Sequence, residues 1–167
     1  MEDEIVDIVD EEDNVIKKMK RSEAEKNNCR LRVAKILVFN EEEKLVIQKR
    51  IDDKKRNYPG MWDIGIGETV KSDECYEDAA IRGLQEEYGI KVEYLQYLFK
   101  FVFRGSLCRN YAVYKVYVNE PVKFDPKEIE KIKKVTKNDL IQMFDIKKFT
   151  PPSIPIYQKY LEINNGN

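Results

Sequence analysis

The chain has 167 residues, a length typical of one domain, and 42% of them are hydrophobic, which is enough to build a core. Its 30 basic and 31 acidic residues leave a formal net charge of −1, which excludes the strongly basic class of proteins that coat nucleic acid. There is no histidine, which excludes catalytic triads and zinc, iron or haem sites that depend on histidine ligands.

Three further features bear on where the protein works. The cysteines, Cys29, Cys75 and Cys108, are widely spaced and form no C-x-x-C pair, which predicts reduced thiols rather than disulfides or a zinc ribbon. No run of about 18 apolar residues exists, so we expect no membrane span. The acidic first 13 residues differ from the basic start of a signal peptide. We therefore expect a cytoplasmic protein with no membrane partner and no bulk nucleic-acid binding.

The first 28 residues predict a short hairpin and a connector. Apolar residues 5–9 and 15–16 flank the acidic turn at residues 10–14, an arrangement typical of two short strands. Residues 17–26 are basic and polar, which predicts a solvated connector.

The middle of the chain predicts a longer hairpin and then the clearest helix. Residues 31–39 are apolar and β-rich, and residues 45–48 predict their partner strand across a polar turn. A short extended segment at residues 61–66 follows. We expect the helix to begin at Ser72, which acts as its N-cap, and to end before Gly89.

The last third predicts another hairpin and two helices. Aromatic and β-branched residues 92–103 and 111–118 predict two strands, a capping box predicts a helix over residues 137–144, and a last helix carries apolar residues along 156–163. No repeat or long linker divides the chain. We therefore expect a single domain over residues 1–167 with an α+β fold, in which helices pack on a mixed sheet.

The segment from residue 68 to residue 90 carries the pattern that points to chemistry. At 100° per residue, Gly83, Glu86 and Glu87 fall on one side of the predicted helix, so the two carboxylates lie beside each other. Neighbouring carboxylates repel one another unless a cation or solvent separates them, and Mg²⁺ binds through a few such oxygens while it keeps water and phosphate ligands. For an isolated pair of glutamates, a solvated charged face is the alternative.

The spacing of this segment resembles the signature of the Nudix hydrolases, G-x5-E-x7-R-E-U-x-E-E-x-G-U, where U is a bulky aliphatic residue. Seven positions match at fixed offsets, namely Glu74, Arg82, Leu84, Glu86, Glu87, Gly89 and Ile90. Residues 45–50 and 59–63 also resemble the family, and both chain ends resemble the branch close to isopentenyl diphosphate isomerase. The resemblance covers nearly the whole chain and implies the Nudix α/β/α sandwich, with a mixed β-sheet between helices.

Two positions depart from the signature. The leading glycine is replaced by Glu68, and the glutamate expected after Arg82 is replaced by Gly83. In the family, that glutamate belongs to the set that binds metal and activates water. We therefore expect weakened turnover, and we expect Gly83→Glu to raise turnover and to stabilise the helix by up to about 1 kcal/mol. Isomerase activity is excluded, because Gly67 and Thr69 stand where the isomerase has its catalytic cysteine and metal-binding histidine.

The resemblance also implies roles for individual residues. Glu86 and Glu87 would hold the metal, and Gly67 would either offer it a carbonyl oxygen or form a plain tight turn. Glu74 and Arg82 would form a structural ion pair between the loop and the helix.

Further acidic and basic residues are candidates for catalysis and substrate binding. An acidic residue before the last strand would serve as base or extra ligand, and the candidates are Glu128 and Glu130, for which a solvated acidic turn is the alternative. Diphosphate oxygens favour basic partners, and the main candidates are Arg50, Arg56 and Arg104, for which ordinary surface positions are the alternative.

These roles together imply a MutT-like Nudix pyrophosphohydrolase. It would use Mg²⁺ or Mn²⁺ to hydrolyse a nucleoside diphosphate linked to another group, X. The alternative, favoured by Gly83, is a catalytically inactive Nudix domain that binds a nucleotide, an RNA end or a protein. The substrate and the oligomeric state stay open at this point.

Overall fold

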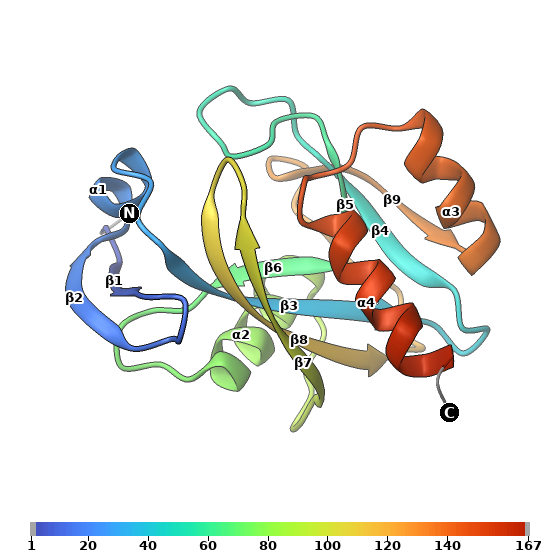
Figure 1. Cartoon of the computed structure of the whole chain (residues 1–167). Helices are drawn as coiled ribbons and strands as arrows, with labels where there is room; N and C mark the ends of the chain where they lie inside the picture. Colours follow the sequence, from blue (N-terminus) through green and yellow to red (C-terminus); the bar gives the residue numbers. More distant parts are fainter. Residues whose placement is uncertain (1–2, 166–167) are drawn as a thin grey trace.

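A computed structural model describes residues 3–165 as a mixed seven-stranded sheet with helices and a separate two-stranded hairpin (Figure 1). The strands of the large sheet are β3 (Leu31–Phe39), β4 (Leu45–Arg50), β5 (Trp62–Ile64), β6 (Ile66–Thr69), β7 (Gln96–Arg104), β8 (Cys108–Tyr117) and β9 (Ile129–Val135). The order of neighbouring strands across the sheet is β5-β4-β3-β8-β7. In addition, β6 pairs with β3 and β9 pairs with β4. Only β3 and β8 run parallel among these described pairs, so the sheet is mixed, as predicted.

Strands β3 and β4 do not form the long hairpin that the sequence predicts. They pair only at Phe39 and Leu45, beside the turn, and then diverge. Strand β6 takes the place of β4 along β3, while β5 and β9 flank β4. Gly65 separates β5 from β6 with a φ of 66°, and a Cβ there would collide with the carbonyl oxygen of Ile36. The divergence opens the sheet where polar side chains of β4 and β6 can face a common space.

The core lies on both faces of the sheet because the residues of β3 alternate in direction. Ala34, Ile36 and Val38 pack in one buried cluster with helix α2, and Leu37 and Phe39 pack in a second cluster with helix α4. The helices are α2 (Tyr76–Tyr88), α3 (Lys137–Ile146) and α4 (Ser153–Asn165). This two-sided packing is the α/β/α arrangement that the sequence predicts.

The N-terminal segment differs from the prediction. The hairpin consists of β1 (Ile5–Val9) and β2 (Val15–Lys20), and a short helix, α1 (Arg21–Lys26), follows at once. Residues 17–26 are therefore strand and helix rather than a connector. Val6, Ile8 and Ala24 form a small buried cluster with Leu31, which attaches this segment to the start of β3.

Helix α2 begins later than predicted, with Cys75 rather than Ser72 as its N-cap. The Ser72 hydroxyl donates instead to Asp7 of β1 at 2.8 Å, and Asp73 has a φ of 66°, which lies outside the helical region. Gly89 ends the helix in the left-handed conformation, as predicted. The capping box between Thr136 and Asp139 is also present at the start of α3. No helix within residues 3–165 is long and apolar enough to cross a membrane.

Candidate functional site

A cavity of about 580 Å³ lies where β4, β6 and α2 approach the N-terminal segment. Side chains of both charges line it. The acidic ones include Glu68, Glu86, Glu87 and Glu128, and the basic ones include Arg50, Arg56 and Arg82. The cavity therefore collects most of the charged residues that the sequence predicts for the site, together with Glu68, which sequence analysis identifies only as a departure from the signature.

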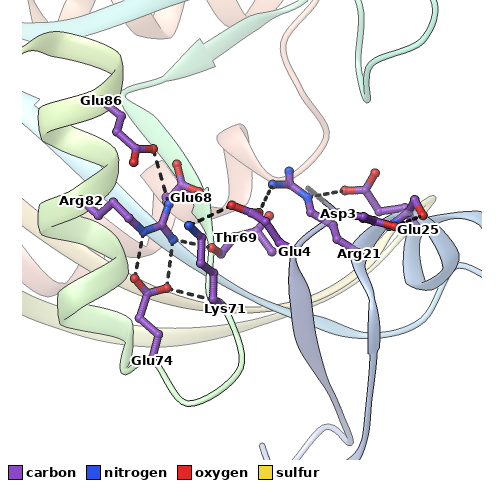
Figure 2. A network of polar contacts seen from close by, with 11 residues as sticks. Asp3, Glu4, Arg21, Glu25, Glu68, Thr69, Lys71, Glu74, Arg82 and Glu86 are labelled. Atoms are coloured by element: carbon purple, nitrogen blue, oxygen red, sulfur yellow. Dashed lines mark hydrogen bonds and ion pairs between the residues drawn. The ribbon is translucent and has the colours of Figure 1, made fainter. Parts of the chain in front are cut away.

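Arg82 is the centre of an ion-pair network at one side of this cavity (Figure 2). Its Nε and Nη2 donate to the two carboxylate oxygens of Glu74, each at 2.9 Å, and Nη2 also donates to the Thr69 carbonyl at 3.0 Å. Its Nη1 lies 3.0 Å from Glu68 and 3.5 Å from Glu86. The pair of Glu74 and Arg82 therefore joins the loop to the helix, which is the structural role that the sequence predicts.

The same network reaches the N-terminal hairpin. The Lys71 amide donates to Glu74, and its ammonium group lies 2.9 Å from Glu4, which in turn lies 3.2 Å from Arg21 (Figure 2). The segment before β3 thus helps to form the wall of the cavity.

Gly83 is buried where α2 packs against β6. A Cβ placed on Gly83 would lie 2.7 Å from Cβ and 3.0 Å from Cγ of Glu68, closer than side chains pack. The expectation that Gly83→Glu stabilises the helix is therefore wrong for this chain, because helix propensity is outweighed by a close contact between elements.

Glu86 and Glu87 are neighbours on α2 but lie in different surroundings. The Glu86 side chain is 60% exposed. Glu87 is partly buried and accepts a hydrogen bond from the Gln48 amide at 3.3 Å. Burial, together with the charge of Glu68, raises the pKa of Glu87 to about 8. A cation beside Glu87 would favour its ionised form.

Gln48 is a residue that sequence analysis missed. It is only 2% exposed, it lines the cavity from β4, and its Oε1 has no hydrogen-bond partner among the described residues. Buried polar atoms are rarely left without a partner, so this oxygen is suited to a ligand in the cavity. The available signal was the first polar residue after the apolar run Leu45-Val46-Ile47.

The donor set fits a hard divalent cation. Carboxylate and amide oxygens are the ligands that Mg²⁺ and Mn²⁺ prefer, and here they face one cavity. Within the described part of the chain, no three acidic or cysteine side chains already surround a common point closely enough to enclose an ion. Protein oxygens would therefore supply part of the coordination and water or phosphate the rest.

The structure separates the two candidate bases. Glu128 lines the cavity and lies 3.0 Å from Arg56. Glu130 is two residues further along, does not line the cavity, and lies 2.6 Å from Lys49. Glu128 precedes β9, and Glu130 lies where the register of β9 against β4 shifts, so the regular alternation of a strand does not place the two glutamates on one face.

The remaining predicted site residues differ in whether they line the cavity. Gly67 is not a tight turn, because it lies within β6 opposite Lys35, and it does line the cavity. Arg50 and Arg56 line the cavity as well. Arg104 is instead paired with Glu11 through two contacts of 2.7 Å and does not line the cavity.

Comparisons with known proteins agree with this fold. The family model described as NUDIX domain matches residues 30–160. An uncharacterized Nudix hydrolase of Yersinia pestis is 31% identical over 163 residues, covering 97% of this chain and 88% of that protein. A crystal structure from Deinococcus radiodurans has a TM-score of 0.82 at 23% identity, covering 93% of this chain and 98% of that one. The NUDIX domain of Shewanella oneidensis NrtR, solved with ADP ribose, has a TM-score of 0.63 at 14% identity, covering 86% and 98% of the two chains. This chain belongs to the Nudix family.

Proposed function

We propose that this protein is a metal-dependent hydrolase that cleaves the diphosphate bond of a nucleoside diphosphate linked to another group. The observation that carries the proposal is the meeting of opposite charges in one cavity. The carboxylates of Glu86 and Glu87 line this cavity, and so do Arg50 and Arg56. Gln48 of β4 adds an amide to the same lining. A cavity with this composition suits a divalent cation and the diphosphate that accompanies it.

Glu86 and Glu87 would hold Mg²⁺ or Mn²⁺, with the Gly67 carbonyl as a further donor. Such an ion, when bound, neutralises charge on the phosphate oxygens and lowers the pKa of water. Arg50 and Arg56 bind phosphate oxygens through their guanidinium groups and orient the substrate. Glu128 accepts a proton from the attacking water at its carboxylate. The water oxygen forms a bond to phosphorus, and the bond from that phosphorus to the bridging oxygen breaks, so the bridging oxygen leaves with the other phosphate.

A product-release screen tests the proposal. Purified protein is incubated with nucleotides, nucleotide sugars, dinucleotides and capped RNA, with Mg²⁺, with Mn²⁺ or with EDTA. We expect hydrolysis of at least one nucleoside diphosphate derivative that depends on the metal and is reduced at least a hundredfold in Glu87→Gln. Glu130→Gln is the matched control, because Glu130 lies outside the cavity and its loss should leave the rate unchanged. Equal rates in Glu87→Gln and the wild type would contradict the proposal.

A binding module is the second candidate function, and Gly83 is the observation that favours it. Residue 83 lacks the carboxylate that the Nudix signature places there, while the cavity beside it is retained. The NUDIX domain of NrtR was solved with ADP ribose, so ADP-ribose is a suitable probe. Calorimetric binding of ADP-ribose without any turnover, in the presence of Mg²⁺, would favour the binding module over the hydrolase.

A further inference from the structure

We propose that Glu68 of β6 supplies the metal-binding carboxylate that residue 83 of α2 lacks, an inference that rests on the proposed metal-dependent function. In the Nudix signature, the position of Glu68 is a glycine and the position of Gly83 is a glutamate. This chain therefore carries the same two residue types with their positions exchanged.

The exchanged residues, Glu68 and Gly83, are in contact in the folded protein. An added Cβ on Gly83 would lie 2.7 Å from Cβ, 3.0 Å from Cγ and 3.3 Å from Oε2 of Glu68. The Glu68 side chain therefore occupies the volume that a side chain at residue 83 would enter. Only one of the two positions can carry a long side chain, and here the carboxylate comes from the strand instead of the helix.

The Glu68 carboxylate is held in a defined position. Its side chain is 13% exposed, and Oε1 lies 3.0 Å from Nη1 of Arg82. Oε2 is the oxygen that lies over Gly83, and the side chain lines the same cavity as Glu86 and Glu87. A carboxylate that is fixed on one oxygen by an arginine and faces two other carboxylates is well placed to complete a cation site.

A second observation points independently to a ligand in this place. Gln48 is 2% exposed and lines the cavity, and its Oε1 is unpartnered within the described residues, while its Nε2 donates to Glu87. The side chain of Gln48 thus carries a buried oxygen without a partner and lines the same cavity as Glu68 and Glu87. A divalent cation or its bound water would satisfy this oxygen and reduce the repulsion between the two carboxylates.

The test uses Mn²⁺ itself as the probe, with binding followed by electron paramagnetic resonance of free Mn²⁺, and thermal unfolding measured in EDTA. The proteins are the wild type, Glu68→Gln, Gly83→Glu and the double variant Glu68→Gly/Gly83→Glu. Glu130→Gln is the control for the loss of one carboxylate outside the cavity.

We expect Glu68→Gln to bind Mn²⁺ at least tenfold more weakly while its Tm in EDTA stays at or above that of the wild type. Glutamine keeps the shape of the side chain and an oxygen for Arg82, so packing is preserved. Gly83→Glu alone should lower the Tm because it collides with Glu68. The double variant should recover the Tm and bring Mn²⁺ affinity to within about threefold of the wild type, since tenfold is about 1.4 kcal/mol and threefold is half of that.

Two results would overturn the inference. One is wild-type Mn²⁺ affinity in Glu68→Gln, and the other is a folded double variant that binds Mn²⁺ no better than Glu68→Gln. If the double variant does not fold, the Mn²⁺ affinity of Glu68→Gln tests the inference by itself. Failure of the proposed function looks different, because Mn²⁺ binding that depends on Glu68 can occur without hydrolysis of any substrate in the screen. A wild type that binds no Mn²⁺ overturns both.

Discussion

Two parallel hydrogen bonds join Arg82 of α2 to Glu74 of the loop before it, and both nitrogen-to-oxygen distances are 2.9 Å. Their side chains are only 19% and 16% exposed, so the pair is shielded from solvent on most sides. The guanidinium group also reaches the Thr69 carbonyl and Glu68, which makes it the point where β6, the loop and α2 are joined. A two-point contact of this kind orients the helix as well as stabilising it.

Glu74→Ala should therefore destabilise the protein, because it leaves Arg82 with a partly buried charge and fewer acceptors. We expect a loss of about 1–3 kcal/mol, or a decrease in Tm of roughly 3–10 °C for a chain of this size. Differential scanning fluorimetry measures it. Asp73→Asn is the control, because asparagine tolerates the φ of 66° while the change removes the charge that pairs with Lys18 at 2.7 Å, in a pair whose side chains are 84% and 50% exposed. Equal Tm changes in the two variants would contradict a special role for the pair of Glu74 and Arg82.

The raised pKa of Glu87 predicts how stability depends on pH in the absence of metal. Its folded pKa of about 8 lies above the ordinary value of 4.5, so the folded protein binds more protons than the unfolded protein between these pH values. The resulting stabilisation is complete below about pH 4.5 and is lost as pH rises through 8. After burial itself, the charges of Glu68 and Glu128 also raise the pKa of Glu87, while the hydrogen bond from Gln48 and the charge of Arg50 lower it.

Glu87→Gln should remove this dependence, since glutamine does not ionise. We expect the difference in Tm, variant minus wild type, to grow from pH 5 to pH 8.5 in EDTA, by several degrees in favour of the variant. Thermal melts across that range provide the measurement, with Glu130→Gln as the control. A constant difference in Tm would show that Glu87 ionises as an ordinary exposed glutamate.

The buried pair of Lys35 and Asp63 should be a major source of stability. The ammonium group lies 2.5 Å from the Asp63 carboxylate, which also accepts hydrogen bonds from Thr150 and Ser153, and all four residues are at least 94% buried. These contacts join β3 and β5 to the start of α4.

Lys35→Met should cost about 3–5 kcal/mol, because the buried aspartate would lose its nearest cation and keep only Arg50, at 4.0 Å. Urea unfolding gives the change in free energy. Lys44→Met removes a similar ion pair, with Glu42, whose side chains are 38% and 66% exposed, and it should have little effect. A similar loss of unfolding free energy in both variants would mean that burial does not determine how much an ion pair contributes to stability.

Arg56 and Arg104 provide a test of substrate binding. Each is paired with a glutamate, Glu128 and Glu11 respectively, but only Arg56 lines the cavity. With any substrate that the screen identifies, Arg56→Ala should raise KM about tenfold, which corresponds to about 1.4 kcal/mol, while Arg104→Ala should leave KM unchanged. Steady-state kinetics measures both, and a KM effect of Arg104→Ala equal to that of Arg56→Ala would contradict the assignment of the cavity.

The sequence by itself determined the features that depend on neighbouring residues. Glu86 and Glu87 both line the cavity because helical periodicity places them on one side of α2. Gly89 ends that helix because glycine readily adopts a left-handed conformation. The capping box of Thr136 and Asp139 is equally local. The match of seven signature positions indicated the family for the same reason, since all of them lie within one loop and helix.

Only the tertiary structure decided what depends on contacts between distant segments. Helix α2 starts later than the sequence predicts because Ser72 donates a hydrogen bond to Asp7, which is 65 positions away. Gln48 lines the cavity because β3 and β4 diverge after one paired position. The contact of Glu68 with Gly83 exists because β6 packs on α2, and no periodicity within either element encodes it. Local hydrogen bonding sets periodicity and caps, whereas packing between elements sets which side chains share a space.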